Sequence, residues 1–294
     1  MKFRVPATTG NTGPGFDSVG LAFTLYARFE AELLPAGQLA ISGCEAKYQN
    51  EENLAVQAFR AVEKRLGVQP AGLKLHIDTD VPISRGLGSS ATLLAAGAFA
   101  ANALHGAPLD KEMLLDVTTQ MEGHPDNAAP ALYGGLCASV VGGDGRVLCV
   151  RYPVAPSVRF AALIPDFPLA TAEARRVLPA AIARGDIVYN LSRTAILMRG
   201  MEMGDYALLS AALDDRLHTP YRKALIHDFD FVRAQALEAG ARALVISGAG
   251  PTLLALHPDP EAFAPQIEAR LSALSHKWRA VPLNVDTEGT VEER

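Results

Sequence analysis

The clearest pattern along the chain is an alternation of apolar and polar residues between positions 23 and 33. A period of two is typical of a β-strand with one buried face and one face in solvent. Similar but shorter patterns predict strands at 3–6, 73–77, 136–141, 147–152, 160–164, 243–247, 253–256 and 280–285. Gly142-Gly143-Asp144-Gly145 lies between two of these strands, so the pair 136–141 and 147–152 is expected to form a hairpin.

Apolar residues at helical spacing fill several of the intervals between these strands. The pattern predicts helices at 53–66, 90–105, 109–122 and 260–274, and several more between residues 172 and 239. Gly67 is expected to end the first of these helices. The helix at 90–105 is apolar on nearly every side, so we expect it to be buried.

The order of these elements indicates an α+β protein with two domains. A chain of 294 residues is long enough for about two hydrophobic cores. Pro153 and Pro156 follow the hairpin, so the boundary is predicted there, with domains 1–153 and 154–294. In both domains, helices are expected to pack on one face of a mostly antiparallel sheet.

Composition and charge exclude several classes of function. The formal net charge of −5, without a cluster of Lys and Arg, argues against a nucleic-acid partner. Cys44, Cys137 and Cys149 are scattered, which favours buried thiols in a reducing cytoplasm over a zinc site or a disulfide framework. The apolar pattern at 91–104 is too short to span a bilayer, and no signal peptide is visible at the N-terminus, so we expect a cytoplasmic protein without a membrane partner.

A loop rich in glycine and serine joins a predicted strand to the buried helix. Its sequence is Pro82-Ile83-Ser84-Arg85-Gly86-Leu87-Gly88-Ser89-Ser90-Ala91-Thr92. The glycines permit unusual backbone angles and leave room for a phosphate, and the first-turn N–H groups of the helix can bind its oxygens. The loop lacks the Gly-Lys-Ser/Thr of a Walker A loop and the last glycine of GxGxxG. Taken alone, a turn capped by Ser89 or Ser90 explains it equally well.

Two polar segments add candidate ligands. Glu122 ends a predicted helix, and a rigid turn leads to Asn127, which is expected to open the next helix. Mg²⁺ favours hard oxygen ligands, which Glu122 and Ser90 can supply, although alone this segment is better explained as a helix-capping turn. The glycine-rich loop at 6–17 offers Asn11 as donor and acceptor and Asp17 as a partner for an ammonium group, or else it is a surface loop.

A fourth segment, Ser247-Gly248-Ala249-Gly250-Pro251-Thr252, lies between two predicted strands. By itself it indicates a tight hairpin, although it could also support the loop at 82–92 across the domain interface.

Together, these four segments in this order resemble the GHMP kinase superfamily, and most closely its homoserine kinases. The segments at 171–179 and 218–222 add to the resemblance, which extends from Val5 to Leu256. It implies an N-terminal ATP-binding domain with a left-handed βαβ element, a ferredoxin-like C-terminal domain, and ATP bound between them. The implied reaction is phosphorylation of the side-chain hydroxyl of L-homoserine for threonine biosynthesis, with ATP and Mg²⁺ as cofactors.

The resemblance also implies a role for individual residues. Asn53 and all residues from Pro82 to Thr92 correspond to the ATP site, with Ser90 and Glu122 holding Mg²⁺. For the acceptor, Asp17 corresponds to the ligand of the ammonium group, Arg175 and Arg222 to ligands of the carboxylate, and Thr171 to a further contact. Asn11 and Asn127 correspond to residues that position the reacting hydroxyl, and Asp126 is assigned as an orienting residue rather than a general base.

Three alternatives remain at this point. Another GHMP kinase could act on mevalonate or a related alcohol, although Asp17 and the paired arginines suit an amino-acid head group. A member of the fold without catalytic activity is disfavoured by Ser90 and Glu122, and a translation-related binding module by the lack of a basic surface. The chain departs from the family at Thr12, where leucine is usual. The expected partners are small molecules, and a homodimer is left open because dimers are common in the family.

Overall fold

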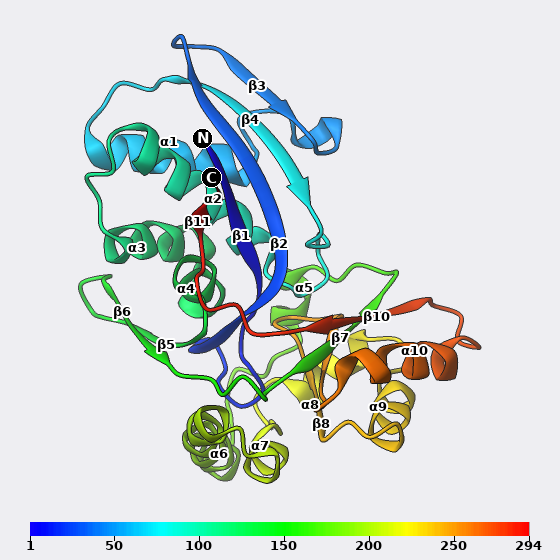
Figure 1. The fold of residues 1–294 in the computed structure, drawn as a ribbon. Helices are drawn as coiled ribbons and strands as arrows, with labels where there is room; N and C mark the ends of the chain where they lie inside the picture. The colour runs from blue at the N-terminus through cyan, green and yellow to red at the C-terminus, as the bar shows by residue number, and fades with distance from the viewer. Residues whose placement is uncertain (294) are drawn as a thin grey trace.

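The structure is a computed structural model that describes residues 1–293 (Figure 1). A larger sheet contains β1 (Lys2–Thr9), β2 (Val19–Leu34), β3 (Leu39–Ser42), β4 (Gly72–Thr79), β5 (Leu136–Val141), β6 (Val147–Tyr152) and β11 (Val291–Glu292). A smaller sheet contains β7 (Phe160–Pro165), β8 (Ala243–Ile246), β9 (Leu253–Leu256) and β10 (Trp278–Leu283). The first half of the chain also forms a short 3₁₀ helix, η1 (Ala46–Tyr48), and helices α1 (Leu54–Leu66), α2 (Ser89–Leu104), α3 (Lys111–Glu122) and α4 (Pro125–Tyr133). The second half forms α5 (Thr171–Arg176), α6 (Arg184–Met203), α7 (Tyr206–Ala212), α8 (Thr219–Arg222), the 3₁₀ helix η2 (Lys223–Leu225), α9 (Phe229–Glu238) and α10 (Pro260–Leu271).

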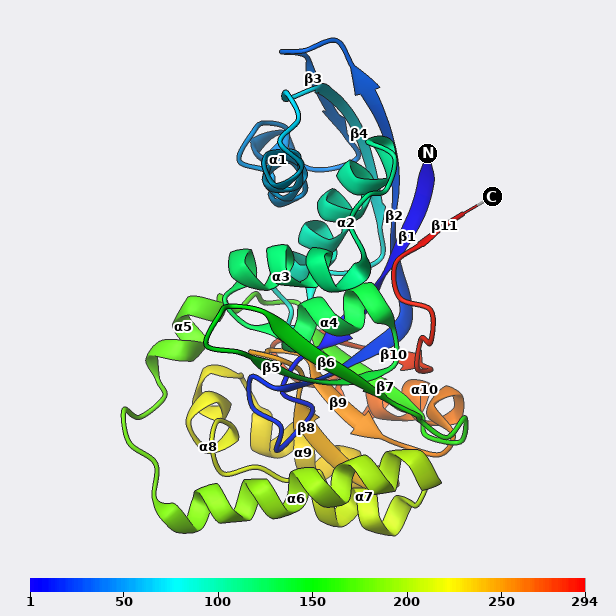
Figure 2. The same ribbon diagram turned by 90° about the vertical axis from the view of Figure 1, so that its left-hand side faces the viewer.

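The long strand β2 organises the larger sheet, because it pairs with β1, β4 and β5 along its length. The parallel pair β3 and β4 is joined through α1, which gives the βαβ element implied by the resemblance; the other strand pairs that the structure describes in this sheet are antiparallel. Helices α1 to α4 cover one face of this sheet (Figure 2). Helix α2 is buried as predicted, and it approaches α1 closely because Gly97 has no side chain: a Cβ there would lie 1.9 Å from the carbonyl oxygen of Ala55.

The smaller sheet has the strand order β10-β7-β9-β8 with every pair antiparallel, which is the ferredoxin-like arrangement. Alternate residues of its strands belong to two separate apolar cores. One face packs on α9 and α10, and the other faces α6, α7 and the larger sheet, where Phe160 meets Phe23 edge-on. The predicted α+β architecture with two sheets is therefore confirmed.

The last residues of the described chain return to the larger sheet. After β10, Val285 bridges to Phe23, and β11 then pairs with β1. The chain passes from the larger sheet to the smaller one between β6 and β7, where the predicted boundary falls. However, β11, near the end of the described chain, belongs to the larger sheet again. The division into 1–153 and 154–294 stays a prediction. Within residues 1–293, no helix is long and apolar enough to cross a membrane.

Candidate active site

Segments that are far apart in the sequence meet at a cavity between the two sheets. It is lined by thirteen of the predicted site residues: Asn11, Asp17, Ser84, Gly86, Gly88, Ser89, Ser90, Glu122, Asp126, Asn127, Thr171, Arg175 and Arg222. The loop at 6–17 is deeply buried at Asn11 and Thr12, so the surface-loop alternative is wrong.

The loop before α2 has the features of an anion-binding turn. Gly88 precedes the helix in a left-handed conformation, with a φ of 69°, and it offers no side chain that could cap the first turn. The Ser90 hydroxyl bonds instead to Glu122, so the alternative of a serine-capped turn is wrong. The first N–H groups of α2 are left available at the edge of the cavity.

The glycines of this loop are needed for a different reason than the sequence indicates. A Cβ at Gly88 would lie 2.0 Å from Thr8 Oγ1, and a Cβ at Gly86 would lie 2.4 Å from the carbonyl oxygen of Ser247. The space beside these glycines is therefore filled by protein. Leu87 and Ala91 are fully buried, and neither lines the cavity.

Ser90 and Glu122 form a pair of oxygen donors that fits Mg²⁺. The Ser90 hydroxyl donates to Glu122 Oε2 at 2.7 Å, and both residues line the cavity. Burial raises the pKa of Glu122, and a nearby divalent cation would oppose that effect. The bonded partner of Glu122 is thus a hydroxyl rather than a basic side chain, which sets it apart from a salt-bridged helix end.

An ion pair between Asp17 and Arg175 crosses the cavity. Two bonds of 2.8 and 3.0 Å join the carboxylate to the guanidinium, and they raise the pKa of Arg175. The loop that carries Asp17 is held by Asn11, whose Oδ1 accepts from the Asp17 N–H and whose Nδ2 donates to the Gly248 carbonyl oxygen. Asn11 and Asp17 are both left-handed, a conformation that Asn and Asp tolerate better than most residues. Thr12 shares it, and its hydroxyl donates to the Val19 carbonyl oxygen.

Arg222 is a buried cation at the floor of the same cavity. Its guanidinium donates to the carbonyl oxygens of Ala174 and Gly248, at 3.1 and 3.0 Å. Burial and the neighbouring charge of Arg175 lower the pKa of Arg222. Among the described residues no carboxylate forms an ion pair with it. The arrangement leaves positive charge facing the cavity beside Arg175.

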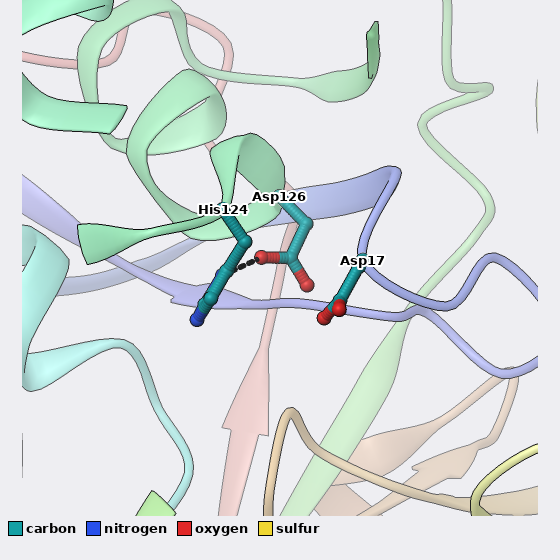
Figure 3. A group of neighbouring side chains, drawn as sticks. All are labelled: Asp17, His124 and Asp126. Carbon is teal, nitrogen blue, oxygen red and sulfur yellow. Dashed lines mark hydrogen bonds and ion pairs between the residues drawn. The ribbon is translucent and has the colours of Figure 1, made fainter. Parts of the chain in front are cut away.

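The first turn of α4 holds a second polar group (Figure 3). Helix α4 begins at Pro125, two residues earlier than predicted, so Asn127 lies inside the helix rather than at its start. Asp126 accepts from the Asn11 N–H at 2.9 Å, and His124 Nδ1 lies 2.5 Å from its other oxygen. Asn127 Oδ1 accepts from the Thr8 hydroxyl at 2.9 Å.

His124 is a site residue that the sequence analysis missed. Burial opposes its charged form, but the bond to Asp126 and the charges of Asp126 and Glu122 outweigh burial and raise the pKa of His124. His124, Asp17 and Asp126 each offer one atom that could ligate a metal, a ring nitrogen or a carboxylate oxygen. These three atoms lie within 4.8 Å of one another. The signal was its place inside the polar segment at 122–127, where only Glu122, Asp126 and Asn127 were given roles.

A second cavity, more apolar, adjoins the loop at 82–92, which is expected from the sequence to bind phosphate and is called the phosphate-binding turn below. Asn53, Thr92, Ile83 and Ser84 line it together with Tyr48, Leu54 and Leu93, and it reaches Ser89 and Ser90. The Asn53 side chain caps α1 by accepting from the Ala55 N–H, and it donates to the Tyr48 carbonyl oxygen. Its lining is mostly apolar with a few polar groups, as is usual for sites that bind small molecules.

The segment at 247–252 supports the phosphate-binding turn, in addition to connecting β8 and β9. The Ser247 hydroxyl donates to the Gly86 carbonyl oxygen at 2.6 Å, and the Thr252 N–H donates to that of Arg85. The Arg85 side chain points away from the main cavity and donates to the carbonyl oxygens of Pro165 and Asp166. It lines a neighbouring groove with Pro82. The segment is thus a tight connection between two strands, as its sequence alone indicates, and it also makes the contacts across the interface that the sequence left possible.

Comparisons with known proteins agree with this geometry. The model of the GHMP kinases N terminal domain matches residues 53–135, and that of the GHMP kinases C terminal domain matches residues 195–274. A homoserine kinase from Clostridium botulinum is 40% identical over 99% of this chain and 98% of the relative, and one from Microchaete diplosiphon is 44% identical over 96% and 91%. A crystal structure of homoserine kinase from Cytophaga hutchinsonii superposes with a TM-score of 0.89 at 28% identity, covering 99% of this chain and 96% of the other. The chain belongs to the homoserine kinase family of the GHMP kinases.

Proposed function

We propose that this chain transfers the terminal phosphoryl group of ATP to the side-chain hydroxyl of L-homoserine, releasing ADP and O-phospho-L-homoserine. One observation carries the assignment. Asp17 and the two arginines, Arg175 and Arg222, face one cavity beside the oxygen donors Ser90 and Glu122. A short zwitterion with a hydroxyl at its far end matches that distribution of charge.

The nucleotide is assigned to the second cavity and the turn next to it. The base and ribose lie in the cavity lined by Asn53, and the triphosphate follows residues 82–92 to the start of α2. Main-chain N–H groups and the positive end of the helix dipole stabilise its oxygens. Ser90 and Glu122 hold Mg²⁺, which supplies charge neutralisation at the phosphates when bound.

The acceptor binds by separating the Asp17–Arg175 pair. Asp17 takes the ammonium group, and Arg175 and Arg222 take the carboxylate, with Thr171 at the same wall. Asp17 and Arg175 each exchange one partner of opposite sign for another, and Arg222 gains one, so no buried charge is left unpaired. Asn11 and Asn127 then orient the hydroxyl toward the terminal phosphate.

Proton transfer in this scheme needs no dedicated base. The Asp126 carboxylate is already engaged by His124 and by the Asn11 N–H, which suits an orienting group better than a proton acceptor. The hydroxyl oxygen forms the new bond to phosphorus as the bond to ADP breaks, and the proton passes to a phosphate oxygen.

The setting follows from this assignment. A kinase that makes O-phosphohomoserine serves threonine biosynthesis, and we place it in the cytoplasm, where ATP is available. A homodimer stays a prediction from the family resemblance.

The test is an ADP-release assay with L-homoserine, L-serine, L-threonine and mevalonate as acceptors. We expect kcat/KM for L-homoserine to exceed that for each of the other three by at least about 100-fold. The Glu122→Gln variant serves as the control for contaminating kinases. Preference for mevalonate would support the alternative alcohol kinase, and no transfer to any acceptor would support a member of the fold without activity.

A further inference from the structure

His218 is a fully buried histidine that has no role in the proposed reaction. It begins the segment His218-Thr219-Pro220-Tyr221-Arg222, which contributed to the resemblance and in which only Arg222 was assigned a role. It does not line the active-site cavity, so it does not touch the substrates. It lies instead between Arg222, one helical turn away, and the loop at 6–17, which carries Asp17 and is called the acceptor loop below.

The hydrogen bonds of His218 fix one form of its ring. Nε2 lies 3.0 Å from the carbonyl oxygen of Gly13, which can only accept, so Nε2 carries the proton. Nδ1 is then the acceptor, and it faces Arg222 Nη1 at 3.5 Å. Burial lowers the pKa of His218 although Asp215 opposes the effect, and the charges of Arg222 and Asp17 also face the ring. The neutral ring therefore connects the acceptor loop to the guanidinium.

Phe16 extends this connection to both arginines. The Phe16 and His218 rings stack with their centroids 5.6 Å apart. The guanidinium carbons of Arg222 and Arg175 lie 5.4 and 6.0 Å from the Phe16 ring centroid, within the range of a cation–π contact. Two aromatic rings thus support the two cations assigned to the acceptor carboxylate.

The base of this group is held from the other side by Asp215. Its carboxylate accepts from the main-chain N–H groups of Leu217, His218 and Thr219, at 2.9, 3.0 and 2.6 Å. Asn190 Nδ2 lies 2.7 Å from Asp215 Oδ1 and 3.0 Å from the Pro14 carbonyl oxygen. The start of α8 and the acceptor loop are consequently joined at two points, and His218 is the one beneath Arg222.

We propose that His218 is a positioning residue for the acceptor carboxylate, which holds the loop at Gly13 and presents the Arg222 guanidinium to the substrate. The assignment rests on the proposed function, because Arg222 is taken as a ligand of that carboxylate. Binding of the acceptor then depends on His218, whereas binding of ATP does not, since the ATP site lies on other segments of the chain.

The test compares His218→Phe, which keeps a stacking ring and removes both hydrogen bonds, with His218→Gln, which can donate to Gly13 and accept from Arg222. His105→Phe is the matched control, because His105 also packs on a phenylalanine and bonds a buried carboxylate, Glu63, away from the site. We expect His218→Phe to raise KM for L-homoserine about 10- to 100-fold and to leave KM for ATP and kcat within about threefold. His218→Gln should restore most of the loss, and His105→Phe should leave both KM values unchanged.

A second substrate separates positioning from general damage to the fold. 3-Aminopropan-1-ol has the amine and hydroxyl of L-homoserine but lacks the carboxylate, so His218→Phe should lose much less kcat/KM with it than with L-homoserine. An equal loss with both acceptors, or an equal rise in KM for ATP, would overturn the assignment to His218. Failure of the wild-type chain to phosphorylate L-homoserine would instead overturn the proposed function. If His218→Phe does not fold, His218→Gln carries the same comparison.

Discussion

Replacing Gly88 with alanine tests whether the phosphate-binding turn needs glycine because a side chain there would clash with the rest of the protein. The added Cβ would lie 2.0 Å from Thr8 Oγ1 and 3.2 Å from Asn127 Oδ1. The residue would also have to keep a φ of 69°, which costs an L residue about 1–2 kcal/mol. Overpacking of a well-filled site adds about 1–3 kcal/mol. We expect Gly88→Ala to lower the free energy of unfolding by about 2–5 kcal/mol.

Gly67 provides a control for the backbone contribution alone. It has the same φ of 69° after α1, and nothing lies within 4 Å of the position that its Cβ would occupy. Gly67→Ala should therefore cost only about 1–2 kcal/mol. The difference between the two variants isolates the contact with Thr8.

A double-mutant cycle with Thr8→Ala completes the argument. Thr8→Ala alone removes the bond from the Thr8 hydroxyl to Asn127 and should cost about 1 kcal/mol. In the double variant the clashing oxygen is absent, so the combined loss should fall short of the sum by about 1–3 kcal/mol. Urea unfolding followed by circular dichroism measures all four proteins. Additive losses, or equal losses for Gly88→Ala and Gly67→Ala, would refute the reasoning.

Three further predictions address the chemistry of the site. Glu122→Gln should lower kcat at least about 100-fold while the affinity for L-homoserine, measured calorimetrically, stays the same, since the residue faces the phosphates; unchanged turnover would remove it from the metal site. Asp126→Asn should keep the pH–rate profile and lose less than about 100-fold in kcat, whereas a larger loss with intact binding would indicate a general base. Because burial lowers the pKa of His218 from its ordinary 6.5, the unfolded chain binds a proton below about pH 6.5 that the folded chain does not. Wild type should therefore lose stability relative to His218→Phe between pH 7.5 and 5, and a constant difference in urea midpoint would contradict this.

The elements with a regular pattern were predictable from the sequence. β2 was recognised from its alternation, although it begins at Val19, four residues before the alternation becomes regular. The strand β3 was missed because it has no fully buried residue, and β11 because two residues are too few for a period to be seen. β11 also depends on β1, which lies at the other end of the sequence, so its pairing is set by the tertiary fold.

The candidate site was predictable as a set of segments, and its contacts were not. Phosphate chemistry identified residues 82–92, but the direction of the Arg85 side chain depends on carbonyl oxygens near residue 165. From the sequence, Gly86 and Gly88 were explained by the room that a ligand needs. In the structure, the space that their side chains would occupy is filled by Ser247 and Thr8. Such contacts join residues more than 70 positions apart, and local pattern holds no information about them.

We expect the burial of Arg222 to give the proposed acceptor site its selectivity. The buried guanidinium bonds to two carbonyl oxygens and forms no ion pair with a carboxylate of the described residues. The Gly248 carbonyl oxygen accepts from both Arg222 and Asn11, so the cation and the acceptor loop are fixed by the same atom. An acceptor with a carboxylate supplies the missing charge, while an acceptor without one leaves a desolvated cation unpaired. A site of this kind rejects the analogue that lacks the charged group more strongly than an apolar pocket rejects a change in size. We therefore expect selectivity for an amino acid over a simple alcohol to depend on how deeply Arg222 is buried as well as on the shape of the cavity.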